Sequence, residues 1–94
     1  MSDAFDRSPV PDYPALLRLD ARGFTVVGAG RGIGRQAAHA LAEAGARVVC
    51  ADADRDRADA VAAEIGGTPW SGDVRSRDAV ERLIADAGRT DCPP

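Results

Sequence analysis

The stretch Val26-Val27-Gly28-Ala29-Gly30-Arg31-Gly32-Ile33-Gly34 decides how this chain is interpreted. The β-forming run Phe24-Thr25-Val26-Val27 leads into it, and an alanine-rich segment with helical spacing follows it. Glycines between a strand and a helix permit a sharp turn that leaves the first N–H groups of the helix uncovered. Such a turn is typical of a site for a pyrophosphate, whose negative charge suits the positive end of a helix.

Three of the glycines have separate predicted roles. Gly28 suits the tight turn at the strand end, Gly32 the close approach of a ligand, and Gly34 the packing of the helix on the sheet. The spacing is G-x-x-x-G-I-G, because Ile33 stands where a G-x-G-x-x-G pattern beginning at Gly28 would need glycine. Gly30 is an additional glycine within this pattern.

Strand and helix patterns alternate along the chain. We expect strands over 24–27, 47–51 and 68–71, and helices over about 32–44, over about 56–65 and from Ser76 onward. This order predicts an α/β fold, namely the N-terminal half of a Rossmann-like, doubly wound parallel sheet with three strands and three helices. The last strand contains Pro69, which cannot donate a ladder hydrogen bond, so we expect it at a sheet edge.

Each predicted helix has an apolar face that we expect to pack on the sheet. These faces comprise Ile33, Ala37, Ala40, Leu41 and Ala44 in the first helix, Ala58, Val61, Ala62 and Ile65 in the second, and Ala79, Val80, Leu83, Ile84 and Ala87 in the third. Cys50 is expected to be a core residue, and Trp70 an apolar anchor at the sheet edge. His39 lies in mid-helix without a nearby Cys, Asp or Ser, which predicts a surface or packing residue.

The composition limits the classes of function. The 94 residues carry a net charge of −3, with scattered arginines and no aromatic platform, which argues against a nucleic-acid partner. The apolar stretches are too short to cross a bilayer, and the N-terminus lacks the apolar run of a secretory signal, so we expect a cytoplasmic protein. Cys50 and Cys92 lack metal-ligand spacing, so no metal is predicted. Residues 1–14 are proline-rich and predict a flexible arm, and 15–92 predict the folded domain.

An acidic residue at the end of the second predicted strand bears on the choice of cofactor. Asp52 follows Gly28 by 24 positions, where its carboxylate can accept hydrogen bonds from both hydroxyls of an adenosine ribose. The same charge would repel a 2′-phosphate, so NAD is favoured over NADP. Against this preference, Arg31 and Arg55 could each accept a phosphate.

Two acidic residues of the predicted site also have plainer interpretations. Asp52 could instead cap a helix within the acidic loop that contains Asp54 and Asp56. Asp73 could be a turn residue before the third helix. Both alternatives stay open at this point.

Three ordered motifs resemble the short-chain dehydrogenase/reductase family. They are the glycine turn with its flanks, the segment 45–52 with its terminal acidic residue, and Gly72-Asp73-Val74, which is similar to the adenine-contacting pair of that family. Residues 88–91 also look like the family's approach to its fourth strand. The resemblance covers about residues 15–92 and implies an NAD(P)-binding part of an oxidoreductase. The cofactor contacts that follow are Gly28, Arg31, Gly32, Ile33, Gly34, Asp52, Asp73 and Val74.

The catalytic residues of that family have no counterparts here. The family moves a proton with a Tyr whose pKa is lowered by a Lys four residues later, helped by Ser and Asn. This sequence contains no Lys and no Asn, and Tyr13 precedes the glycine turn. We therefore expect a truncated, NAD-binding portion that is inactive alone.

The end of the sequence leads to a further expectation about partners. Cys92-Pro93-Pro94 stands where the family has its fourth strand, so strand 24–27 should present an edge open to self-association. Two other functions stay open. One is a module that binds NAD or an adenine nucleotide without reacting it, and the other is a fragment that docks on a full-length relative through that edge and modulates it.

Overall fold

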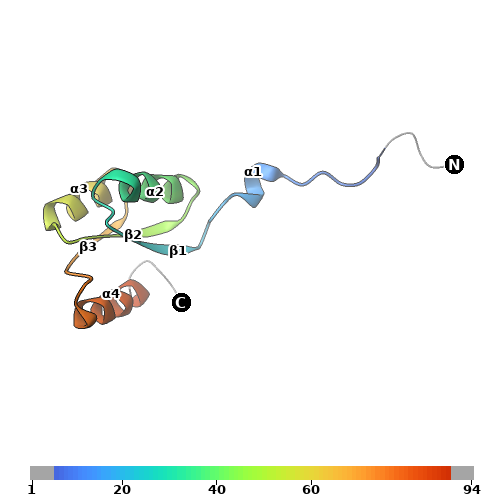
Figure 1. The fold of residues 1–94 in the computed structure, drawn as a ribbon. Coiled ribbons are helices and arrows are strands. Elements are labelled where there is room, and N and C mark those ends of the chain that lie inside the picture. Colours follow the sequence, from blue (N-terminus) through green and yellow to red (C-terminus); the bar gives the residue numbers. More distant parts are fainter. Residues whose placement is uncertain (1–5, 90–94) are drawn as a thin grey trace.

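The computed structural model describes residues 6–89, which form a three-stranded parallel sheet with helices on both of its faces (Figure 1). The elements are α1 (Tyr13–Leu16), β1 (Gly23–Val27), α2 (Gly32–Glu43), β2 (Arg47–Asp52), α3 (Arg55–Ile65), β3 (Thr68–Ser71) and α4 (Arg77–Arg89). The helices α2 and α3 cover one face of the sheet and α4 covers the other. The predicted Rossmann-like half with parallel strands is confirmed, and α1 is a helix that the sequence analysis did not predict.

The central position of β2 in the sheet accounts for the continuous apolar run in its sequence. The sheet order is β1-β2-β3, with Val27 opposite Ala51 and Ala51 opposite Trp70. Val48 and Cys50 pack toward the cluster under α2 and α3, whereas Val49 and Ala51 pack toward α4. A strand covered on both sides has no polar face, which is why alternation is missing from its sequence. Cys50 is confirmed as a core residue, and burial raises the pKa of its thiol.

The edge position of β3 is also confirmed. Within residues 6–89, β3 pairs with β2 alone, so Pro69 needs no second partner strand. In the same range β1 pairs with β2 alone, and self-association through β1 stays a prediction.

The predicted packing face of α2 is wrong in part. Ile33 is 89% exposed and Ala40 is also exposed, whereas Ala38, which was left out of the predicted face, is fully buried. The reason is Gly34, where an added Cβ would collide with the Gly28 carbonyl, so α2 approaches the turn most closely there. Ala38 lies one helical turn later on the same side, and it is buried for that reason.

The packing face of α4 is narrower than predicted. Ala79, Leu83 and Ala87 are buried at intervals of four residues, but Ile84 is 68% exposed. A single helix on a small sheet buries only the row that faces β2, so the adjacent row containing Ile84 stays in solvent. Trp70 packs on this cluster and its indole N–H donates to Asp86 Oδ2 at 3.1 Å, which confirms it as an anchor.

The segment that precedes β1 contains a short helix and tertiary hydrogen bonds over residues 12–20. The one-turn helix α1 begins where Asp12 Oδ1 accepts the Ala15 N–H at 3.3 Å, with Pro14 in the first turn. Further on, Arg18 donates to Asp20 at 2.8 Å and Leu19 N–H donates to the Ala44 carbonyl at 2.7 Å. The predicted boundary at residue 14 therefore falls inside a helix. Flexibility of the arm stays a prediction, and residues 1–5 and 90–94 lie outside the described chain.

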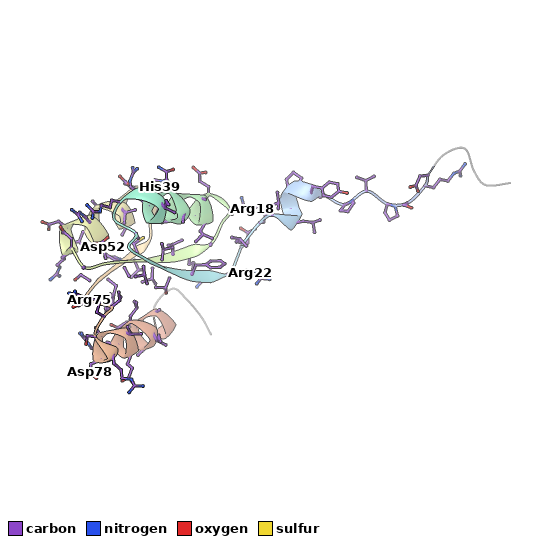
Figure 2. All side chains as sticks on the ribbon, viewed as in Figure 1. Arg18, Arg22, His39, Asp52, Arg75 and Asp78 are labelled. Atoms are coloured by element: carbon purple, nitrogen blue, oxygen red, sulfur yellow. The ribbon has the colours of Figure 1, made fainter. Side chains whose placement is uncertain are left out.

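An ionic cluster joins the outer faces of α2 and α3. Arg35 donates from Nε and Nη2 to the two carboxylate oxygens of Glu64, each at 3.0 Å, and His39 Nε2 lies 2.9 Å from Glu64 Oε1. His39 is half-buried in this cluster on α2, as expected of a packing residue (Figure 2). The hydrogen bond from Arg35, and then that from His39, lowers the pKa of Glu64 to about 2.

This cluster predicts a specific loss of stability in acid. Because the pKa of Glu64 is lower in the folded chain than its ordinary value of 4.5, its stabilisation is present above that value and is lost as pH falls toward 2. We expect Glu64→Gln to flatten the acid limb of the urea-unfolding midpoint, measured by circular dichroism. Glu81→Gln, on α4, is the control that should leave the acid limb unchanged. Equal acid limbs for wild type and Glu64→Gln would contradict the prediction.

Candidate functional site

The carboxyl ends of the three strands open into a cleft of about 780 Å³. It is lined by the glycine turn, the end of β2, the first turn of α3 and the loop after β3. The lining residues are Val27, Gly28, Arg31, Gly32, Asp52, Ala53, Arg57, Gly72, Asp73, Val74 and Arg75. Figure 2 shows Asp52 and Arg75 at this end of the sheet and Arg18 and Arg22 at the opposite end. In open parallel sheets, ligands bind outside the carboxyl ends of the strands.

The glycine turn has the backbone geometry that its sequence predicts. Gly28 and Gly32 have φ values of +75° and +59°, a left-handed conformation that L side chains rarely adopt. An added Cβ at either position would meet nothing within 4 Å, so both line the cleft without filling it. At the start of α2, Arg31 makes no side-chain capping hydrogen bond. The N-terminus of α2 is therefore available to an anion in the cleft.

Gly30 has a role that the sequence analysis missed. Its N–H donates to Asp52 Oδ2 at 2.9 Å, which joins the turn after β1 to the end of β2. An added Cβ would collide with Arg57 Cβ and lie 2.7 Å from Asp52 Oδ2. The signal in the sequence was the glycine itself, which stands outside the spacing of the motif.

The Asp52 carboxylate is held by backbone donors and lies among cations. Oδ1 accepts the Asp54 N–H at 2.9 Å, and Oδ2 accepts the N–H of Gly30. The hydrogen bond from Asp54, then that from Gly30, then the charges of Arg57 and Arg31, lower the pKa of this carboxyl. Each oxygen retains acceptor capacity, so an ionised Asp52 can also receive hydroxyl groups from a ligand.

The residue that caps α3 is Asp54, not Asp52. Asp54 Oδ1 accepts the N–H groups of Asp56 at 2.9 Å and Arg57 at 3.3 Å. The helix-cap alternative for Asp52 is therefore not what the structure shows.

Asp73 forms the turn that was its alternative interpretation, and it also lines the cleft. Its Oδ1 accepts the backbone N–H of Arg75 at 2.9 Å, and its carbonyl accepts the Ser76 N–H at 2.9 Å. Arg75 Nε and Nη2 also donate to the carboxylate, at 3.0 and 3.1 Å. The Arg75 side chain is 90% exposed, and an ion pair this exposed contributes little to stability because solvent screens it. The pair is weak enough for a ligand to displace.

The structure brings most of the predicted site residues together. Those that line the cleft are Gly28, Arg31, Gly32, Asp52, Asp73 and Val74. Ile33 points into solvent instead, and Gly34 supports the turn from beneath. Arg55 is absent from the lining, whereas Arg57 and Arg75, which the sequence analysis did not single out, are part of it.

These residues fit a dinucleotide in three respects. An uncapped helix start lies behind the glycine turn, Gly28 and Gly32 leave open space above it, and a carboxylate stands at the end of β2.

Within residues 6–89, no cluster of His, Cys, Asp or Glu could hold a metal ion. In the same part of the chain, no helix combines the length and apolar character needed to span a membrane.

The fold is that of a Rossmann-like α/β fragment with a cleft at the carboxyl ends of its parallel strands. The family model described as short chain dehydrogenase matches residues 24–90. The chain therefore belongs to the short-chain dehydrogenase/reductase family, which implies a nicotinamide cofactor.

Individual relatives show how much of the family fold is present. Sorbitol dehydrogenase of Cereibacter sphaeroides is 39% identical over 72 residues, which cover 74% of this chain and 28% of that protein. Galactitol 2-dehydrogenase (L-tagatose-forming) of the same organism is 34% identical over 79 residues, covering 81% and 31%. The crystal structure of a hydroxysteroid dehydrogenase from Escherichia coli superposes with a TM-score of 0.73 at 34% identity, covering 82% and 33%. The chain thus spans about a third of the length of these relatives.

Proposed function

We propose that this chain is the NAD-binding portion of a short-chain dehydrogenase-type oxidoreductase, and that these residues bind the dinucleotide without turnover. The observation that carries the proposal is the hydrogen bond from Gly30 to Asp52, which holds the Asp52 carboxylate beside the glycine turn. This arrangement supports binding of a ribose at the carboxylate and of a pyrophosphate at the turn. Bound NAD would supply the hydride chemistry of the family. The residues of this chain would bind and orient it.

Each part of the dinucleotide has a matching group in the cleft. The pyrophosphate fits the start of α2 behind Gly28 and Gly32, where N–H groups and the helix dipole favour negative charge. The adenosine ribose fits at Asp52, and the adenine fits between that carboxylate and the Asp73-Val74 pair on the loop after β3. The negative charge at Asp52 favours a free 2′-hydroxyl, and hence NAD over NADP.

The proposed lack of turnover follows from the side chains available. Oxidation of an alcohol by NAD requires a base that takes the hydroxyl proton and has a pKa near the working pH, which a tyrosine reaches only beside a cation. Tyr13 lies on α1 outside the cleft, and the sequence contains no Lys. We therefore expect binding of NAD by these 94 residues without reduction of it by an alcohol.

A direct test is calorimetric titration of the chain with NAD, after circular dichroism has shown it to be folded. Saturable binding is the expected result. A folded chain that gives no binding heat across several temperatures would contradict the proposal. Measurable NAD reduction in the presence of alcohols would contradict the absence of turnover and leave the binding proposal standing.

Asp52→Ala is expected to weaken NAD binding about tenfold, because two hydrogen bonds to ribose hydroxyls are lost at about 0.5–1.5 kcal/mol each. NADP binding should fall less, because the same change removes a repulsive charge. Asp59→Ala, an exposed aspartate of α3 outside the cleft, is the matched control and should change neither affinity. Equal losses for NAD and NADP would contradict the role of Asp52 in choosing between them.

A further inference from the structure

The outer edge of β1, which faces away from β2, carries unpaired backbone groups at alternate residues. The Arg22 carbonyl accepts the Arg47 N–H at 2.9 Å, and the Gly28 N–H donates to the Ala51 carbonyl at 2.8 Å. Because successive residues of a strand direct their N–H and C=O groups to opposite edges, the even-numbered residues of 22–28 face β2. The residues that direct these groups to the outer edge are Gly23, Thr25 and Val27. Within residues 6–89, β1 pairs with β2 alone, so this edge is open.

Apolar side chains of α2 lie beside the outer edge. The helix α2 packs on β1 and β2, whereas α3 packs on β2 and β3, so α3 lies on the side of α2 that is away from the outer edge. Arg35 marks that side, because it donates to Glu64 of α3. Ile33 and Ala37 stand two residues before and after Arg35, and therefore lie on the opposite side of the helix. Ile33 is 89% exposed there.

The helix on the other face of the sheet also leaves apolar side chains beside the outer edge. Leu83 of α4 packs toward β2, and Asp86, on one side of Leu83, accepts the indole N–H of Trp70 from β3. Val80 and Ile84 lie on the other side of Leu83, which is the side of β1. The open strand edge is thus flanked by apolar side chains on both faces of the sheet.

A second copy of this chain fits the outer edge in one register. An antiparallel pair of β1 strands centred on Thr25 matches Thr25 with Thr25 and Gly23 with Val27, so each open N–H and C=O group finds a partner. Gly23 has no side chain and leaves room for Val27. Strand β1 contains no charged residue, the common device against such pairing. The two β2 strands then lie three strand spacings of about 4.8 Å apart, which allows the two α4 helices to lie side by side.

We propose that a second copy of this chain pairs its β1 antiparallel with β1, and that Arg22 of the second copy completes the anion-binding end of the cleft. The register centred on Thr25 places Arg22 of one copy opposite Gly28 of the other, with their Cα atoms about 4.5 Å apart. Arg22 and Val26 lie on the same face of β1, and Val26 packs under α2 and α3. The Arg22 side chain therefore leaves the sheet on the face that carries α2, and Figure 2 shows it at the start of β1.

The charge of Arg22 links this pairing to the ligand, and this link rests on the proposed dinucleotide site. A guanidinium beside the N-terminus of α2 is repelled by the helix dipole when the cleft is empty, and it is attracted when a pyrophosphate lies between them. The dinucleotide should therefore strengthen the pairing of the two copies. By linkage, the pairing should strengthen dinucleotide binding by the same factor.

Sedimentation equilibrium of the full chain tests the pairing. Wild type should reach twice the chain mass of 9.8 kDa. Thr25→Pro should raise the dissociation constant of the dimer about tenfold or more, because it removes hydrogen bonds at the outer edge and none to β2. Ile84→Glu should also raise it, because like charges meet between the two α4 helices. The matched control is Ala85→Glu, at an exposed position of α4 that faces away from the sheet, and it should leave the dissociation constant unchanged.

Calorimetric titration with NAD tests the contribution of Arg22 to the cleft. Arg22→Gln should weaken NAD binding about fivefold, as expected for loss of one partly exposed charge contact, and NAD should no longer strengthen the dimer. Arg47→Gln is the control, because Arg47 is also exposed at this end of the sheet but lies on β2, away from the outer edge. It should change neither quantity.

The outcomes separate this inference from the function on which it rests. A wild-type chain that stays monomeric with and without NAD overturns the pairing, and so does a dimer that neither Thr25→Pro nor Ile84→Glu weakens. Wild-type NAD affinity in Arg22→Gln overturns the role of Arg22. A dimeric wild type that binds no NAD overturns the proposed function and supports the pairing of β1. Circular dichroism checks folding, and if Thr25→Pro is unfolded, Ile84→Glu carries the comparison.

Discussion

Gly34→Ala is expected to lower the free energy of unfolding by about 3 kcal/mol, the upper part of the range for overpacking a closely packed site. The added methyl group would collide with the Gly28 carbonyl and lie 3.3 Å from Ala29 Cα, both of which are backbone atoms. Backbone cannot rotate away as a flexible side chain can, so α2 must move off the turn. A small domain has a stability of only about 5–15 kcal/mol, so the change should be large in urea unfolding.

The control for Gly34→Ala is Gly88→Ala. Gly88 also lies within a helix, α4, but an added Cβ there meets nothing within 4 Å. Replacing glycine by alanine in an open helical position should stabilise the chain by about 1 kcal/mol. Opposite signs for the two substitutions would establish that contact with Gly28, and not helix propensity, decides the result. Wild-type stability in Gly34→Ala would show that the turn does not pack as described.

Gly32→Val is expected to abolish binding of both NAD and NADP, with a loss of at least about 100-fold, or about 2.7 kcal/mol. The φ of Gly32 is +59°, which strains any β-branched residue, and its missing side chain leaves the cleft open at the start of α2. A valine would place two methyl groups between the helix N-terminus and a pyrophosphate. Titration with both dinucleotides measures the effect.

Gly66→Val separates backbone strain from obstruction of the cleft. Gly66 has a φ of +69°, meets nothing within 4 Å and ends α3 away from the cleft lining. Both variants should therefore lose stability for the same reason, but only Gly32→Val should lose dinucleotide affinity. Retained affinity in Gly32→Val, or equal loss in Gly66→Val, would contradict the assignment of the turn as the site.

The strengths and errors of the sequence analysis have physical causes. The apolar run of β2 predicted a strand covered on both faces, and this is confirmed. The prediction succeeded because a strand that is buried on both sides needs apolar residues at every position. In α2, by contrast, alanines occupy so many positions that helical periodicity does not single out one face. The contact between Gly34 and the Gly28 carbonyl makes that choice, and it turns Ile33 outward and Ala38 inward.

The cleft shows the same division. Local patterns in the sequence predict where the strands and helices begin and end. The cleft residues that lie near those ends could therefore be predicted, namely Gly28, Gly32, Asp52 and Asp73. The positions of Gly30 and Arg57 could not, because they depend on the approach of the turn after β1 to the first turn of α3. That approach is a contact between segments far apart in the sequence, and no local pattern records it.

The sequence alone thus determined the order of the strands and helices and the parallel arrangement of the strands, because both follow from hydrophobic spacing. It also determined that charged residues and glycines gather at the carboxyl ends of the strands, because glycine has the conformational freedom that the turn there requires. The tertiary structure decided which helix faces are buried, that Asp54 caps α3 while Asp52 binds the glycine turn, and that Arg57 and not Arg55 lines the cleft. These outcomes depend on distances of a few ångströms between separate elements, and packing sets those distances only when the whole sheet has formed.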